Sequence, residues 1–216
     1  MFHADRTRAP LDPPGARLVD ALVAGGSLRR FDRNVEIYAQ EDAVDRLYQV
    51  VKGMVLTSRG DIEGRRQICA FYGPGDLFGL EAGPRHEFAA LGLTDCEVRC
   101  ARRSDVRAAV GGLEFDSAVL AATRLELDRA QRHIRILGLK NAREKVYAFL
   151  QSLAGGARSE LCGLPMGRQD IADYLGLTLE TVSRMLTALQ ADDLVEFASH
   201  RAFRLRSHLP ASRLAA

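Results

Sequence analysis

The chain has 216 residues, enough for one or two domains, and its hydrophobic content of 47% is ample for a buried core. The net charge of only +2 does not by itself indicate a nucleic-acid partner, so any such function must rest on the local placement of charge. No apolar run approaches the roughly 18 residues that span a bilayer. The N-terminal stretch also lacks the apolar segment of a signal peptide. We therefore expect no membrane association and a cytoplasmic location.

The first part of the chain has the pattern of a leader followed by β structure. Residues 1–15 are rich in Pro, Arg and Gly, which predicts a flexible leader. The chain then breaks into short apolar segments separated by Gly, Pro and Asp, a spacing typical of an all-β sandwich or barrel. We expect a β-roll domain over residues 16–111, and a β-roll without a ligand is the simplest interpretation.

Residues 112–138 have a helical period instead. Two series of residues repeat every seven positions, offset by three, as in the a/d seam of a coiled coil. The members are Leu120, Leu127 and Ile134 in one series, and Thr123, Ala130 and Leu137 in the other. The seam predicts a dimerisation helix that packs on its own copy. The alternative is a helix packed on its own domain.

Residues 139–216 contain a motif of two short helices. A helix from about 141 to 153 and a short strand within 160–166 precede it. The motif's first helix spans Gln169–Leu175, Gly176 breaks it, and Thr178 is placed to cap the second helix. Helical spacing gives the second helix a buried face, which is expected to pack on the first helix. This face consists of Leu179, Val182, Leu186 and Leu189.

The opposite face of the second helix carries groups that suit DNA base edges. Arg184 offers two parallel donors for guanine, and Glu180 can accept from a cytosine amino group while orienting Arg184. Ser183 is short enough to approach a thymine edge. The alternative is a solvated face with an ordinary Glu–Arg pair, but the helix–turn–helix frame favours DNA readout.

Other side chains are expected to contact the phosphate backbone. The candidates at and along the two helices are Arg168, Thr178, Thr181 and Thr187. After Asp192-Asp193, the sequence alternates like two strands with a turn near Ser199-His200. This predicts a winged hairpin whose Arg201, Arg204 and Arg206 could meet phosphates, and a merely solvated hairpin is the alternative.

At this point the chain resembles the Crp/Fnr family of bacterial transcription regulators, over nearly its whole length after residue 15. The run DIADYLGLTLETVSRMLTALQ resembles the Fnr and FixK branches, and GPGDLFGLEAGPRHEF looks most like FixK-type proteins. The resemblance implies an α+β fold with an N-terminal β-roll (a jelly-roll of the cyclic-nucleotide-binding type), a long dimerisation helix and a C-terminal winged helix–turn–helix. It also implies a homodimer that contacts RNA polymerase, activates transcription and binds double-stranded DNA at TTGA-N6-TCAA through Glu180, Ser183 and Arg184.

Departures from the family pattern suggest that this chain uses no cofactor. Fnr proteins hold an iron–sulfur cluster with N-terminal cysteines, but no cysteine here precedes Cys69. Members that bind cyclic nucleotides carry a Gly-Glu pair and an Arg-Ser pair. Here Leu80 follows Gly79, and His86-Glu87 occupies the location of the Arg-Ser pair, where a carboxylate would repel phosphate. We therefore expect no cofactor, no metal and no small co-activator.

Several alternatives remain open at this level. One is an effector-dependent sensor of the same family, using a cyclic nucleotide or a haem held by His86, although a surface-loop histidine is the commoner case. His133 is expected to be solvated. Cys162 lies close to the helical motif, so its oxidation would place negative charge near DNA, while a small structural thiol is the simpler interpretation. A cupin-like metal enzyme and a ligand-binding module without DNA contact are the remaining classes. No catalytic motif appears, so we expect no enzyme.

Overall fold

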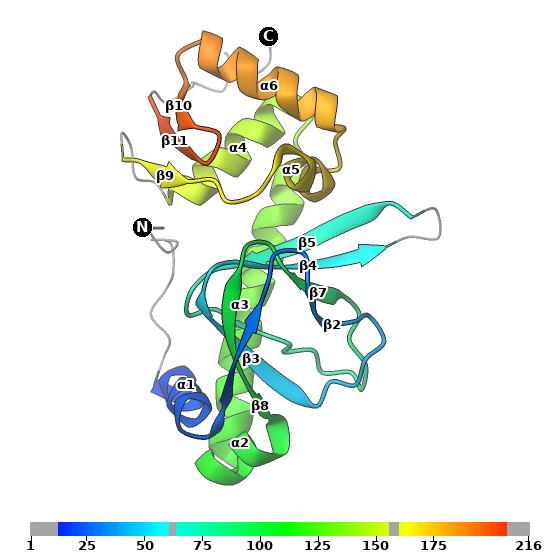
Figure 1. Ribbon diagram of the computed structural model, residues 1–216, viewed down its shortest axis with the longest axis vertical. Helices are drawn as coiled ribbons and strands as arrows, with labels where there is room; N and C mark the ends of the chain where they lie inside the picture. The colour runs from blue at the N-terminus through cyan, green and yellow to red at the C-terminus, as the bar shows by residue number, and fades with distance from the viewer. Residues whose placement is uncertain (1–12, 61–63, 156–159, 207–216) are drawn as a thin grey trace. The chain divides into compact units, whose positions relative to one another are not determined.

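The computed structural model describes residues 13–60, 64–155 and 160–206, and the chain divides between Ala130 and Gln131 into two compact units (Figure 1). The division falls inside the long helix α3 (Gly112–Leu137), so both units include part of it. Most of the predicted leader lies outside the described residues, but helix α1 (Pro13–Gly25) begins within it. Among the described helices, none is both long and apolar enough to cross a membrane.

Two four-stranded antiparallel sheets form the β-roll of the first unit, which confirms the predicted fold class. One sheet has the order β1 (Ser27–Phe31), β8 (Cys96–Arg102), β3 (Arg46–Lys52) and β6 (Leu77–Phe78). The other has the order β2 (Glu36–Tyr38), β7 (Ala89–Gly92), β4 (Val55–Gly60) and β5 (Arg66–Tyr72). Alternating residues of both sheets point inward and form a common core.

Aromatic rings fill much of this inner core. Tyr48 and Phe78 stack with ring centroids 5.1 Å apart, and Phe78 also lies 5.4 Å from the ring of Tyr72. Tyr38 joins them, 5.2 Å from Tyr48. Gly79 is required beside this cluster because its φ is +73° and an added Cβ would lie only 2.7 Å from the Tyr48 ring. The roll interior is therefore packed with side chains.

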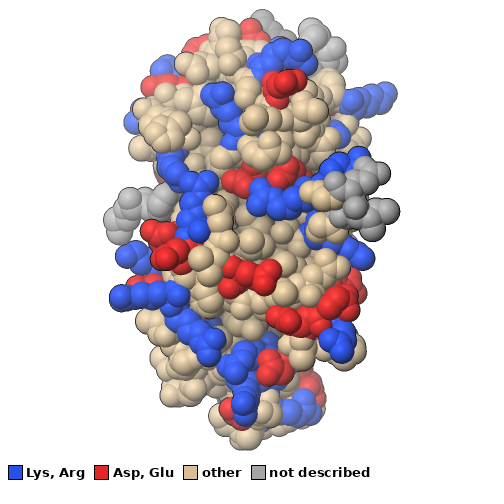
Figure 2. Space-filling model, turned by 45° about the vertical axis from the view of Figure 1, so that its right-hand side comes forward, with Lys and Arg blue, Asp and Glu red and all other residues tan. Residues whose placement is uncertain are grey.

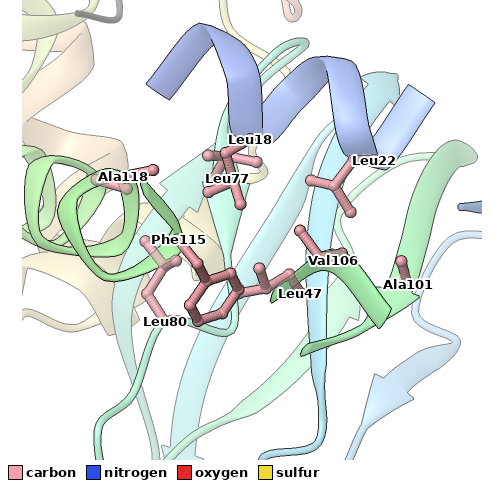
Figure 3. Close-up of a cluster of buried hydrophobic side chains, with 10 residues drawn as sticks. Leu18, Leu22, Leu47, Leu77, Leu80, Ala101, Val106, Phe115 and Ala118 are labelled. Carbon is pink, nitrogen blue, oxygen red and sulfur yellow. The ribbon is translucent and has the colours of Figure 1, made fainter. Parts of the chain in front are cut away.

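A second core covers the outer face of the sheet that contains β1 and β8 (Figure 3). Leu18 and Leu22 reach it from α1, Val106 from helix α2 (Arg103–Val110), and Phe115 from the start of α3. The sequence analysis predicted neither α1 nor α2. In α1, Pro13 and Pro14 occupy the first turn, where proline is well tolerated, although the same residues had suggested an irregular leader.

Helix α3 has apolar residues on two opposite faces. Phe115, Ala118 and Ala122 are buried in the outer core of the β-roll. On another side, four large apolar residues are exposed at a spacing of seven. They are Leu113 (83% exposed), Leu120 (72%), Leu127 (56%) and Ile134 (67%). The helix thus packs on its own domain and also presents the predicted seam, which Leu113 extends by one heptad. Thr123 and Ala130 are exposed as well, and Leu137 is half-buried.

The second unit contains three further helices and a small sheet, which agrees with the predicted winged helix–turn–helix. The helices are α4 (Ala142–Ala154), α5 (Arg168–Leu175) and α6 (Leu179–Ala191). The sheet has the order β10 (Val195–Ser199), β11 (Ala202–Leu205) and β9 (Cys162–Gly163). Helix α4 begins where the Asn141 side chain accepts from the Glu144 amide, and it ends at Gly155 in the left-handed region.

The expectation that His133 is solvated is wrong. Its side chain is buried, and its ring stacks on Tyr174 of α5 with centroids 3.7 Å apart and an interplanar angle of 4°. The Nε2 atom donates to the Tyr174 carbonyl oxygen at 2.7 Å. Helical spacing explains the error, because His133 shares the face of α3 that also buries Ile136 in this unit.

Candidate DNA-binding surface

One side of helix α6 is apolar and is buried in the second unit. Val182, Leu186 and Leu189 are buried, and the helix packs against α4 and α5. Leu179 was predicted to share this buried face but is 44% exposed. At 3.6 residues per turn it lies about 60° around the helix from Val182, at the edge of the apolar stripe. The remaining contacts still determine which side of α6 faces outward.

Local hydrogen bonds define the two-helix frame. The Asp170 carboxylate accepts from the Gly167 amide at 2.9 Å at the start of α5. Helix α5 ends at Gly176, which has φ of +63°, and the Leu177 amide returns to the Ala172 carbonyl. Thr178 then caps α6 as predicted, because its hydroxyl accepts from the Thr181 amide at 3.2 Å. These bonds fix the turn between the helices.

The three predicted base-contacting residues lie on the outer side of α6. Glu180 and Arg184 are exposed, and Ser183 is half-buried. In the described part of the chain, neither Glu180 nor Arg184 forms an ion pair or a side-chain hydrogen bond. The ordinary Glu–Arg pair is therefore not formed, and both charged groups are free to meet a ligand.

The predicted phosphate-contacting residues surround this trio. Arg168, at the start of α5, donates from Nη1 to the Ser183 hydroxyl at 3.4 Å, so the two helices are linked on this side. The Thr187 hydroxyl donates to the Ser183 carbonyl at 3.1 Å. Thr178 and Thr187 are exposed, and Thr181 is half-buried. The helix–turn–helix therefore collects a guanidinium and several hydroxyls beside Glu180, Ser183 and Arg184.

Arg201 lies at the turn of the β10–β11 hairpin. Its side chain is exposed, and its Nη1 donates to the Pro165 carbonyl at 3.3 Å. Elsewhere in this unit, acidic groups are paired with arginines. Glu196 lies 2.8 Å from Arg206, and Asp192 pairs with Arg143. On the face drawn in Figure 2, basic and acidic side chains are likewise interspersed.

The β-roll positions that the sequence analysis singled out, His86 and Leu80, are both buried. His86 was expected in a surface loop, but it is only 1% exposed, because its ring stacks on Tyr38 with centroids 3.7 Å apart. Its Nδ1 lies 3.1 Å from a Glu81 carboxylate oxygen. Leu80 packs into the outer core, away from the inner aromatic cluster. A hydrophobic side chain therefore follows Gly79, and a carboxylate–imidazole pair forms nearby. The Arg103 guanidinium also reaches this region, where its Nη2 donates to the Gly79 and Glu81 carbonyl oxygens.

The described residues also contain no cluster of three or more His, Cys, Asp or Glu side chains able to hold a metal ion. The four cysteines, all in the described ranges, are free thiols.

Comparison with known proteins supports both units. Residues 28–111 match the family described as "Cyclic nucleotide-binding domain", and residues 164–195 match "Bacterial regulatory proteins, crp family". The nitrogen fixation regulation protein FixK of Azorhizobium caulinodans is 39% identical over 206 residues, which cover 92% of this chain and 83% of that protein. The chain belongs to the Crp/Fnr family, in its FixK branch.

Two further relatives agree with this assignment. The solved structure of FixK2 from Bradyrhizobium japonicum is 40% identical and superposes with a TM-score of 0.79, covering 88% of this chain and 96% of that one. The transcriptional activatory protein AadR of Rhodopseudomonas palustris is 34% identical over 178 residues, which cover 77% of this chain and 72% of that protein. This FixK-type chain is therefore a DNA-binding transcription regulator, and α5 and α6 are its helix–turn–helix.

The environment of Cys162 in this regulator disfavours a thiolate. The residue lies in β9, half-buried, and its Sγ is 3.6 Å from the Glu160 carbonyl oxygen. Burial and, to a lesser degree, the charge of Glu160 raise the pKa of the Cys162 thiol. Since the thiolate is the form that reacts with oxidants, this environment favours a structural role over a redox role.

We predict that Cys162 reacts slowly with thiol reagents at neutral pH. Its raised pKa leaves less thiolate than in free cysteine, so alkylation by iodoacetamide at pH 7 should be slower than that of free cysteine. The rate should increase as the pH rises toward its pKa. Mass spectrometry of the peptide containing Cys162 would measure the rate, and a rate equal to or above that of free cysteine at pH 7 would contradict the prediction.

Proposed function

We propose that this regulator binds palindromic sites of the form TTGA-N6-TCAA as a homodimer, without a cyclic nucleotide, haem or an iron–sulfur cluster. One observation carries the proposal. The outer side of α6 presents Glu180, Ser183 and Arg184 together, with both charged groups unpaired, while the opposite side is anchored in the domain. A helix held in this way enters the major groove with its outer side against the bases.

Each member of the trio has a definite partner in the TTGA half-site. The Arg184 guanidinium matches the O6 and N7 acceptors of the guanine. Glu180 accepts from the amino group of a cytosine on the complementary strand, and Ser183 approaches a thymine edge. Arg168, Thr178, Thr181, Thr187 and Arg201 serve as phosphate contacts that set the register of α6 in the groove.

The exposed apolar residues of α3 support a homodimer. Four large apolar side chains in one heptad register would be costly to leave in water, and a second copy of α3 would cover them. A two-fold dimer matches a palindrome, whose half-sites lie about 34 Å apart, one DNA turn.

The packed β-roll supports independence from a small effector. Aromatic side chains occupy its interior, and His86 and Glu81 are bonded to each other. We further propose that the protein acts in the cytoplasm and contacts RNA polymerase as an activator, because the similar protein AadR is described as a transcriptional activatory protein.

The readout by Arg184 can be tested by substitution. Arg184→Ala removes the bidentate contact, so it should reduce discrimination for the guanine of TTGA by about 1–3 kcal/mol while binding to unrelated DNA changes little. Arg201→Ala should instead weaken binding to all sequences and lower the salt dependence by about one phosphate contact. Fluorescence anisotropy with duplexes that differ only at the guanine would separate the two effects.

Gln190→Ala provides a matched control, because Gln190 is also exposed on α6 but lies at its C-terminal end. It should leave both discrimination and affinity unchanged. An Arg184→Ala protein that still prefers guanine as strongly as the wild type would show that another side chain reads this base.

The dimer seam can be tested at Leu127. Leu127→Glu places a charge at the centre of the exposed apolar series, so it should raise the dimer dissociation constant by at least about tenfold and weaken operator binding in parallel. Arg124→Ala changes an exposed residue of the same helix that lies outside the heptad series and should have little effect. Sedimentation equilibrium would measure the dimer dissociation constant of both variants. Unchanged dimerisation of Leu127→Glu would exclude this face as the interface.

A further inference from the structure

A network of polar side chains attaches the second half of α3 to the β-roll. Within the unit that contains the β-roll, Ala122 is the last buried apolar residue of α3. Beyond it, Glu126 and Arg129 face the roll in place of apolar residues, and both are largely buried. The attachment of this part of α3 therefore relies on directional hydrogen bonds.

The bonds connect α3 to β5 and to the turn that follows it. The Tyr72 hydroxyl donates to Glu126 Oε2 at 2.8 Å, and Arg129 Nη1 donates to Glu126 Oε1 at 3.0 Å. Arg129 Nη2 donates to Asp76 Oδ1 at 2.5 Å, and the guanidinium lies over the Tyr72 ring, 5.6 Å from its centroid. Both oxygens of Glu126 and two nitrogens of Arg129 are thus engaged.

The turn itself is fixed to the sheet. Asp76 Oδ2 accepts from the Gly73 amide at 2.8 Å, and the Asp76 carbonyl accepts from the Val50 amide of β3 at 3.0 Å. The Gly75 amide donates to the Val50 carbonyl at 2.6 Å. An arginine held by this turn is therefore held by the sheet.

The network residues are next to seam residues in the sequence of α3. Glu126 and Arg129 precede Leu127 and Ala130 by one position each, and adjacent helical positions are about 100° apart. Because the helix is rigid, fixing the side on which Glu126 and Arg129 lie also fixes the side on which Leu127 and Ala130 lie. Burial raises the pKa of Glu126 and the charge of Asp76 adds to this effect, whereas Arg129 and the Tyr72 hydroxyl lower the pKa and so favour the ionised carboxylate.

We infer that Tyr72, Asp76, Glu126 and Arg129 form a latch that holds α3 at the rotation presenting its seam to a second copy. The inference rests on the proposed function, because it explains how an effector-free chain keeps the seam of α3 ready for dimerisation. The four residues are positioning residues that do not touch DNA.

The test uses the purified full chain without any effector. Tyr72→Phe removes only the hydroxyl and keeps the ring that packs on Phe78. Arg129→Lys keeps the positive charge but not the planar fork that reaches two carboxylates. Asp116→Asn is the control, because Asp116 of α3 also pairs with an arginine, Arg107 of α2, at 2.5 Å, but this pair is exposed and involves no strand.

Each latch variant should raise the dimer dissociation constant by about tenfold or more, as loss of one hydrogen bond to a charged group implies. Operator binding should weaken at low protein concentration and recover once the concentration exceeds the variant's dimer dissociation constant. A variant that merely lost its fold would not recover in this way, and thermal melting provides an independent check. Asp116→Asn should behave like the wild type.

Three other results would overturn the inference. If the wild type binds the operator without effector and both latch variants dimerise as tightly as it does, the latch is wrong and the proposed function stands. If variants dimerise weakly but operator binding does not recover at high concentration, the residues act on the fold and not on the seam. A wild type that neither dimerises nor binds the operator would refute the proposed function itself, and the latch with it.

Discussion

The burial of one side of α6 is the constraint on which the rest of the account depends. Val182, Leu186 and Leu189 have apolar side chains that are stable only inside the domain, and burying them leaves one orientation for the helix. Glu180, Ser183 and Arg184 then lie on the outer side, where the two charged groups remain exposed. The Thr178 cap and the Gly176 turn fix where the helix begins, so the position of the trio along the helix is set as well.

In helix α3 the burial of apolar side chains also sets the orientation, but this helix has two apolar faces. One face completes the cores of the two units, and the other remains exposed at a spacing of seven residues. The exposed face is where a second copy is expected, and the polar network behind it determines its direction. The proposed independence from a small effector and the internal attachment of α3 by Tyr72, Asp76, Glu126 and Arg129 are therefore consistent with each other.

How far the sequence predicts this structure depends on the range of the contacts involved. The two-helix motif, its caps and the hairpin were predictable because glycines, a threonine cap and helical spacing are local signals. The burial of His86 was not, because it depends on stacking with Tyr38 from a distant strand. His133 was misassigned because its burial depends on stacking with Tyr174, which comes from another helix.

The latch residues were missed for a related reason. Tyr72 lies 54 residues before Glu126 and Asp76 lies 53 residues before Arg129, and no spacing rule connects them. Leu113 carried a signal that was available, since it continues the heptad of Leu120 by one step toward the N-terminus. The outer face of α6 was predicted correctly in direction, whereas its contacts with DNA remain a proposal.

The most direct test of the central claim is a titration of a TTGA-N6-TCAA duplex with the purified protein in the absence of any effector. The account predicts saturable binding with two chains per duplex. It also predicts a large loss of affinity when the spacer is lengthened by about five base pairs, because half a helical turn moves the second half-site to the opposite side of the DNA. Binding that is indifferent to the spacer, or that appears only after a cyclic nucleotide is added, would contradict it.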